Sequence, residues 1–279
     1  MNLGSFTGVN LVDMKKILIP TDFSNVASYA IDMALKIQDR IEAQITLLHV
    51  VTKQEESFTS QNSFTLNKPS YLQKLEKIKA EIPTNIETVI LEGKLNEVII
   101  NFLEDGQFDL VLMGTKGTIN RELGGSETEI IVRRSSVPVL SLMSCCKKSD
   151  FKNILFINDF KNQIEIEELH ILKTIIAIFD SKLHFLKITD DNESELLMEK
   201  NMCDFARKNK LENVKMHFFN NDQGIEEGIE TFLEKYNFDM LSIGTNRHLD
   251  FNHWKKSSIA EDLVNHINKP ILTFHLPED

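Results

Sequence analysis

Glycines gather in one loop-forming stretch of the chain, residues 110–142, LVLMGTKGTINRELGGSETEIIVRRSSVPVLSL. Four of the 11 glycines lie there, namely Gly114, Gly117, Gly124 and Gly125. Because glycine has no Cβ, its backbone adopts φ > 0 easily and its N–H group can approach a phosphate closely. Gly125 and Ser126 also precede a helical pattern, and the free N–H groups of a helix start attract anions. The stretch therefore predicts a phosphate site, with a purely structural turn as the alternative.

The sequence repeats itself with an offset of 130 to 138 residues. KKILIPTDFS (15–24) aligns with KNILFINDFK (152–161), and FDLVLMGT (108–115) aligns with FDMLSIGT (238–245). Two further segments, QITLLHV and SSVPVLSL, match KLHFLKI and HINKPILTF in the same order. Such a period indicates two copies of one domain of about 140 residues. We expect an N-terminal extension (1–13), a first domain (14–146) and a second domain (147–279).

Each repeat alternates short apolar segments with segments of helical periodicity. In the first repeat we expect strands at 17–20, 45–51, 87–91, 110–113 and 137–142. Helices are expected after an N-cap at Ser24 and at 71–82, 95–103 and 128–134, with a polar loop at 53–69. Continuous apolar strands separated by helices predict an α/β fold with a parallel sheet covered on both faces. Ligands of such sheets bind beyond the carboxyl ends of the strands, where the strand order reverses.

The segments KKILIPTDFS, LLHV, FDLVLMGTKG and GSETEIIVRRSSVPVLSL resemble the universal stress protein family in its tandem two-domain form. The resemblance covers nearly the whole chain from Met14. It implies two tandem doubly wound domains, each a five-stranded parallel sheet of order 3-2-1-4-5. Nucleotide-binding members carry G-x2-G-x9-G-[ST], which implies ATP or a related adenine nucleotide, alone or with Mg²⁺. The implied binding residues are Pro20, Thr21, Asp22, Val50, Met113, Gly114, Lys116, Gly117, Gly125, Ser126 and Thr128.

The glycine loop departs from the family pattern in length. Gly125 follows Gly114 by 11 positions, whereas the pattern has 13. A loop shorter by two residues loses up to about 7 Å of extended reach. The resemblance with this departure predicts a changed grip on the phosphates and a preference for AMP or ADP.

The second repeat separates structural residues from candidate ligand residues. Ser126 and Glu129 form an S-x-x-E capping box, which Ser258 and Glu261 repeat without a glycine loop. These residues therefore have a sufficient structural reason. Gly117 and Gly125 align instead with Arg247 and Ser257, so the extra glycines of the first repeat favour a ligand.

Other polar residues of the second repeat favour structural roles. Its loop GTNRHLDFNHWKKSS either fills an empty site or binds a different anion. His248 and His253 are five positions apart, which does not favour a metal pair. Asp159 is expected to be structural, as a cap of the following helix. His49, within the apolar segment LLHVV, is expected to be a satisfied core histidine.

Composition limits the classes of partner. The net charge is −11 and the sequence pI is about 5.3. An acidic surface repels phosphate backbones, which argues against nucleic acid. No apolar run reaches the ~18–20 residues of a membrane span, and residues 1–13 lack the regions of a signal peptide. Three cysteines, Cys145, Cys146 and Cys203, form no disulfide framework. We therefore expect a cytoplasmic protein without a membrane partner.

The motifs favour regulation over catalysis. Phosphate-binding and nucleophile motifs such as G-x4-G-K-[ST] and G-x-S-x-G are absent from the sequence. We expect a non-catalytic stress-response regulator that binds an adenine nucleotide in its first domain and hydrolyses ATP slowly at most. The alternatives are a ligand-free tandem scaffold acting through protein contacts and an ATP-using enzyme. The regulatory protein partner is unknown. The last strands of the two domains, 137–142 and 270–275, are expected to pair as an internal pseudo-dimer; a homodimer of chains stays open.

Overall fold

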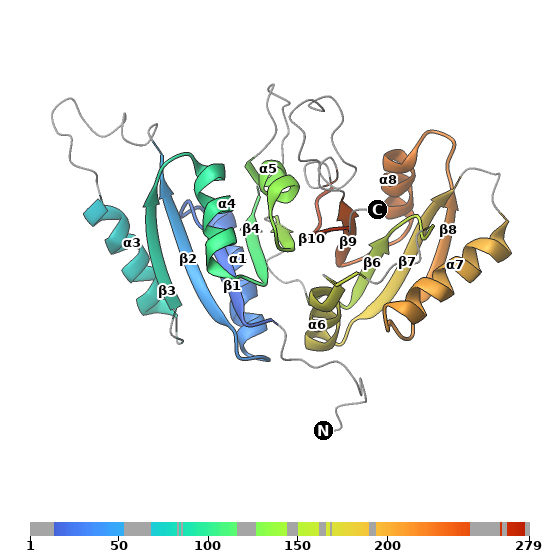
Figure 1. Ribbon diagram of the computed structural model, residues 1–279, viewed down its shortest axis with the longest axis horizontal. Helices are drawn as coiled ribbons and strands as arrows, with labels where there is room; N and C mark the ends of the chain where they lie inside the picture. Colours follow the sequence, from blue (N-terminus) through green and yellow to red (C-terminus); the bar gives the residue numbers. More distant parts are fainter. Residues whose placement is uncertain are drawn as a thin grey trace.

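The computed structural model describes residues 14–52, 68–82, 84, 86–115, 127–143, 150–161, 166–167, 169–189, 194–245, 263 and 267–276. Ten strands within these residues form one sheet in the order β3-β2-β1-β4-β5-β10-β9-β6-β7-β8 (Figure 1). We call residues 14–143 the first half and residues 150–276 the second half. The first half has the expected order 3-2-1-4-5, and the second half has the same order in its own strands. The expected pair of tandem doubly wound α/β units is therefore confirmed.

Strands and helices alternate in both halves. The first half contains β1 (Lys16–Pro20), α1 (Asn25–Gln38), β2 (Gln44–Val51), α3 (Lys68–Glu81), β3 (Ile86–Glu92), α4 (Leu95–Gly106), β4 (Leu110–Gly114), α5 (Glu127–Arg134) and β5 (Val139–Leu142). The second half contains β6 (Asn153–Ile157), α6 (Leu169–Phe179), β7 (Lys182–Thr189), α7 (Glu195–Lys208), β8 (Lys215–Asn220), α8 (Ile225–Lys235), β9 (Met240–Thr245) and β10 (Ile271–His275). The expected elements of the first half are all present, with ends shifted by a few residues.

Local chemistry explains where two elements begin. The Ser24 hydroxyl accepts a hydrogen bond from Ala27 N at 3.3 Å, so the expected N-cap of α1 is confirmed. The sequence predicted that the last strand of the first half begins at Val137, but β5 begins at Val139. The Ser135 hydroxyl donates to Val137 O at 2.7 Å and accepts from Val137 N at 3.2 Å, which holds Val137 in a turn. Pro138 then has no N–H group to offer a sheet.

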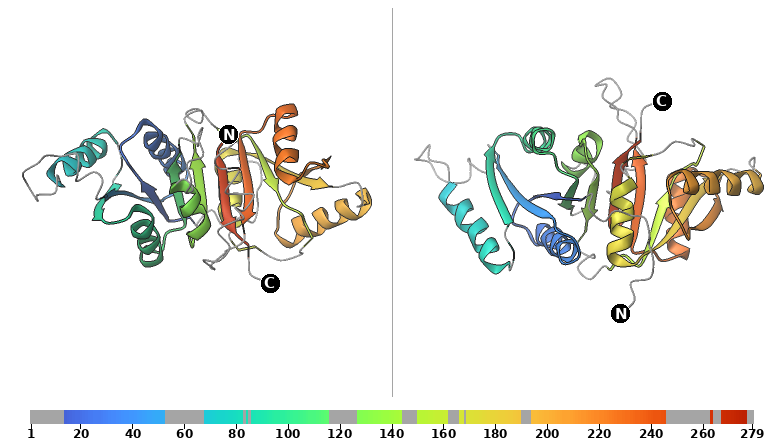
Figure 2. Two further views of the ribbon diagram at one scale, coloured as in Figure 1. Left: turned by 90° about the horizontal axis from the view of Figure 1, so that it is seen from above. Right: turned by 60° about the horizontal axis from the view of Figure 1, so that its bottom comes forward.

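Helices cover both faces of the sheet. Buried side chains of α1, α3, α6 and α7 pack on one face, and those of α4, α5 and α8 pack on the other. Figure 2 shows helices on either side of the sheet in both halves. Burial on two faces explains why a strand such as β4, LVLMG, has no polar side chain. No helix within the described ranges is long and apolar enough to span a membrane.

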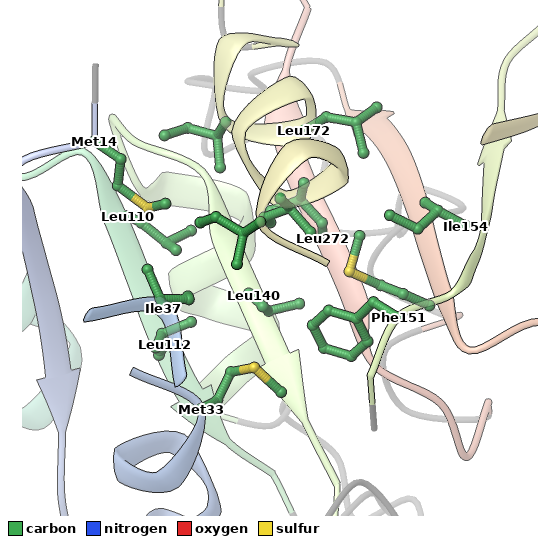
Figure 3. Packing of buried hydrophobic residues seen from close by; sticks show 14 of the residues in the cluster. Met14, Met33, Ile37, Leu110, Leu112, Leu140, Phe151, Ile154, Leu172 and Leu272 are labelled. Carbon is green, nitrogen blue, oxygen red and sulfur yellow. The ribbon is translucent and has the colours of Figure 1, made fainter. Parts of the chain in front are cut away.

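The two halves are joined by the pairing of their last strands. β5 and β10 run antiparallel, with Leu272 opposite Leu140 and Thr273 opposite Val139. The Thr273 hydroxyl donates a hydrogen bond to Val139 O at 3.2 Å. Leu140 and Leu272 are fully buried and lie with Phe151 at the junction of the halves (Figure 3). The expected internal pairing of the last strands is therefore present, and each hydrophobic cluster contains residues of both halves.

This junction makes Leu272 a sensitive position. Leu272→Ala should lower the free energy of unfolding by about 2–5 kcal/mol, because it removes a fully buried side chain from a cluster that both halves share. Urea denaturation measures the change. The matched control is Leu196→Ala in α7, where the residue is 77% exposed and the expected change is under about 0.5 kcal/mol. Equal losses in the two variants would contradict a shared core at the junction.

Two histidines on the neighbouring strands β7 and β8 contact each other inside the second half. His184 Nδ1 lies 3.0 Å from His217 Nε2, and the two rings stack with centroids 5.3 Å apart. Burial lowers the pKa of His184 from 6.5 to about 4, and the nearby His217, Lys215 and Lys182 act in the same direction. Burial and then Lys215 also lower the pKa of His217. Both imidazoles are therefore neutral in the fold at neutral pH.

Because both pKa values are lowered in the fold, the free energy of unfolding should depend on pH. The unfolded chain takes up protons on these imidazoles below about pH 6.5, whereas the folded chain resists them, so stability should fall as pH drops from 6.5 towards 4. His184→Gln should reduce the difference between urea midpoints at pH 7 and pH 5. His170→Gln on α6, outside the pair, should keep the wild-type difference. The idea fails if His184→Gln leaves that difference unchanged.

Candidate functional site

A hollow of about 280 Å³ lies at the carboxyl ends of β1, β2 and β4. It is lined by Pro20, Thr21, Asp22, Ser24, Val26, Ala27, His49, Val50, Thr52, Leu95, Ile99, Met113, Gly114, Thr115, Glu127 and Thr128. The strand order reverses between β1 and β4, the strands that bound this hollow. In doubly wound sheets this reversal is the place where ligands bind.

The hollow gathers the predicted binding residues that the structure describes. They are Pro20, Thr21, Asp22, Val50, Met113, Gly114 and Thr128. Lys116, Gly117, Gly125 and Ser126 lie outside the described residues. The structure therefore brings together residues that the sequence separates by more than a hundred positions, from Pro20 to Thr128.

Some lining residues were not predicted from the sequence. Leu95 and Ile99 come from the first turns of α4, and Glu127 is the first residue of α5. The apolar i, i+4 spacing of Leu95 and Ile99 predicts only that both lie on one face of a helix. Nothing in the local sequence shows which end of that helix lies at the edge of the sheet. Glu127 was assigned no role because the capping box explained its neighbours.

A self-capped turn holds Asp22 at the rim. The Thr21 hydroxyl accepts a hydrogen bond from Phe23 N at 3.1 Å, and Asp22 Oδ1 accepts one from Ser24 N at 2.9 Å. These bonds hold Phe23 at φ 62°, a left-handed conformation that a non-glycine residue rarely adopts. Asp22 is exposed, so its carboxylate is accessible at the mouth of the hollow.

The second half builds the same turn. Asn158 Oδ1 accepts from Phe160 N at 2.7 Å, Asp159 Oδ1 accepts from Lys161 N at 3.0 Å, and Phe160 has φ 55°. Asp159 is therefore structural, as expected. The expectation that it caps the following helix was wrong, because α6 begins only at Leu169. The backbone contact of Asp22 likewise has a structural reason that needs no ligand.

His49 stands behind this turn. It is 2% exposed, and its Nδ1 lies 2.9 Å from Thr21 O. A carbonyl oxygen only accepts hydrogen bonds, so we assign the proton to Nδ1, and Nε2 is then an acceptor. Within the described residues Nε2 has no hydrogen-bond partner, so the expectation of a satisfied core histidine holds for Nδ1 and not for Nε2. The rings of Phe23 and Tyr71 pack against the imidazole, each with its centroid 4.5 Å away.

Gly114 ends β4 directly beneath α1. A Cβ at this position would lie 2.6 Å from the backbone carbon and oxygen of Val26, so glycine lets the start of α1 pack on the strand. In the second half, a Cβ at Gly244 would meet the Leu276 side chain, with Cδ2 at 2.6 Å. Among the described residues, the atoms nearest to a Cβ at Gly114 are helix backbone, whereas those nearest to a Cβ at Gly244 belong to a side chain.

The described wall of the hollow is acidic. Asp22 and Glu127 contribute carboxylates, and no lysine or arginine lines the hollow among the residues that the structure covers. A metal cage is not present in the same ranges, where no group of three or more His, Cys, Asp and Glu side chains could hold an ion.

Comparisons with known proteins agree with this architecture. A model of the universal stress protein family matches residues 14–142. A universal stress protein of Methanocaldococcus jannaschii is 32% identical over 136 residues, which span 45% of this chain and 80% of the relative. The chain belongs to the universal stress protein family. Another family member from that organism is 27% identical over 150 residues, 45% of this chain and 93% of its own length.

The fold of the whole chain also has family counterparts. The crystal structure of a universal stress protein from Archaeoglobus fulgidus superimposes with a TM-score of 0.67 and covers 93% of this chain and 98% of its own. Its sequence identity is 17%, so this likeness concerns the fold alone. The superposed fold includes the second half as well as residues 14–142.

The glycine at the end of β4 can be tested against its counterpart. Gly114→Ala should destabilise the protein by about 1–3 kcal/mol, because a Cβ there overlaps the backbone of α1. Gly244→Ala should cost less, because the Leu276 side chain can turn aside. Thermal or urea denaturation of both variants measures the difference. An equal or larger loss for Gly244→Ala would show that the close approach of α1 is not the reason for Gly114.

Proposed function

We propose that this universal stress protein is a stress-response regulator that binds an adenine nucleotide in the hollow of its first half. The observation that supports the proposal most is the convergence of seven predicted binding residues on one hollow at the reversal of strand order. These residues come from four separate segments of the first half, which the fold brings to one place.

The lining suits the parts of a nucleoside. Val50, Met113 and Ile99 offer apolar surface of the kind that accommodates a planar base. Asp22 at the rim can accept hydrogen bonds from ribose hydroxyls. In this proposal the phosphate side is formed by the start of α5 and by the loop that contains Gly117, Gly125 and Ser126. The volume of about 280 Å³ lies near the lower end for small-molecule sites.

His49 adds support for a ligand. A buried acceptor without a partner is unfavourable, and such groups in native proteins usually have an explanation. His49 lines the hollow while its Nε2 is itself buried, so a ligand or water that reached Nε2 through a shift of the wall and donated to it would remove the deficit. The same imidazole holds the Thr21 carbonyl, so it positions the turn that presents Asp22.

We propose that the protein signals and does not catalyse. The hydroxyls that line the described part of the hollow belong to Thr21, Ser24, Thr52, Thr115 and Thr128. The lining His49 contacts a backbone carbonyl through Nδ1, and no hydroxyl of the described residues hydrogen-bonds to its Nε2. Any hydrolysis of ATP would then be slow, and the output would be a contact with a regulatory protein.

The second half serves as scaffold in this proposal. Leu276 occupies the space beside Gly244, whereas the start of α1 occupies the space beside Gly114. α6 begins at Leu169, eight residues after the turn ends at Lys161, whereas α1 begins directly after its turn. We therefore propose domain limits of 14–146 and 147–279, with the nucleotide site in the first domain only.

Calorimetric titration with adenosine, AMP, ADP and ATP tests the proposal. Asp22→Asn should weaken adenosine binding about tenfold, because it removes a charged acceptor while its amide oxygen can still hold the turn. The matched control is Asp159→Asn, which changes the equivalent turn of the second half and should leave affinity unchanged. Absence of binding by all four compounds would overturn the proposed function.

A further inference from the structure

Glu127 places a negative charge inside the proposed nucleotide site. It is the first residue of α5 and lines the hollow together with Asp22. Glu127 has no ion-pair partner within the described residues. The next acidic residue of the same turn differs, because Glu129 pairs with Arg133 at 3.4 Å and its side chain is only 12% exposed. The uncompensated charge of this turn is therefore that of Glu127.

The position of Glu127 matters because of the helix that it starts. The free N–H groups at a helix start favour an anion, which in a nucleotide site is normally a phosphate. In this chain Glu127 already supplies an anion at that place. A phosphate that approaches the start of α5 meets the helix together with a fixed carboxylate, and a second carboxylate, Asp22, lines the same hollow.

We propose that Glu127 is a specificity-determining residue that makes the site select adenine compounds of low negative charge, adenosine and AMP, over ATP. The inference rests on the proposed nucleotide-binding function and assigns its ligand class. Each further phosphate adds negative charge close to Glu127, and because Glu127 is exposed the repulsion is strongest at low ionic strength. Mg²⁺ bound to the polyphosphate reduces this charge and so reduces the discrimination.

Titration of the full-length protein in the presence of EDTA and low salt tests the inference. Wild-type protein should bind AMP more tightly than ATP. Glu127→Gln should improve ATP affinity relative to adenosine by about 5–10-fold, because it removes one charge and keeps the side-chain shape. Added Mg²⁺ or higher salt should narrow the wild-type preference, as expected for a charge effect.

Glu129→Gln is the matched control. It removes the same charge from the same turn of α5, at a side chain that is paired with Arg133 and does not line the hollow. Its ratio of ATP to adenosine affinity should change by less than about twofold, since a paired charge outside the hollow acts weakly on the ligand. Circular dichroism and thermal melting of both variants confirm that they are folded before the ratios are compared.

The outcomes separate the ligand preference from the binding function. If adenosine binds and ATP binds as tightly as AMP without Mg²⁺, the inference is wrong and the proposed function stands. If both glutamate variants change the ratio equally, the effect is not specific to Glu127 and the inference is also wrong. If neither adenosine nor any nucleotide binds, the proposed function itself fails.

Discussion

The antiparallel pairing of β5 with β10 is the constraint on which the rest of the molecule depends. It turns two five-stranded sheets into one sheet and lets the hydrophobic clusters on both faces run through both halves. Each half alone would present an unpaired edge and an incompletely covered core. Because Leu140 and Leu272 meet at this junction, the packing of one half is part of the stability of the other.

Within this frame the two halves have diverged at their sheet edges. Both keep the self-capped turn after the first strand, which shows that the turn belongs to the fold. The halves differ in the helix that comes after the turn. α1 begins at once and packs on Gly114, whereas α6 begins later and Leu276 packs on Gly244. A duplicated fold can thus keep one edge shaped for a small molecule while the other edge becomes filled, with the shared sheet unchanged.

The sequence was most informative about features with a regular period. Alternating strands and helices followed from apolar spacing, the internal repeat from matching segments, and the N-cap at Ser24 from its local pattern. The strand order was implied by the family resemblance. Two errors arose where a side chain hydrogen-bonds to the backbone two residues away, a local contact that apolar spacing does not reveal. Val137 is held in a turn by Ser135, and Asp159 caps a turn instead of a helix. Three of the lining residues that were not predicted, Leu95, Ile99 and Glu127, lie in the first turns of helices whose place at the sheet edge is set by packing. Gly114 carries two explanations, since close packing on α1 accounts for it without a phosphate.

Because β5 and β10 are far apart along the chain, the junction between them can form only late in synthesis. β5 is complete at Leu142, but its partner β10 ends only at His275, about 130 residues later. At roughly 5–20 residues per second, a ribosome needs on the order of 10–30 s to make that distance. Throughout this interval a folded first half exposes a short apolar edge with unpaired backbone groups. Neighbouring ribosomes on one messenger would then hold first halves that can pair with each other, so the speed of translation bears on whether the chain emerges as a self-paired monomer or as a dimer joined through β5.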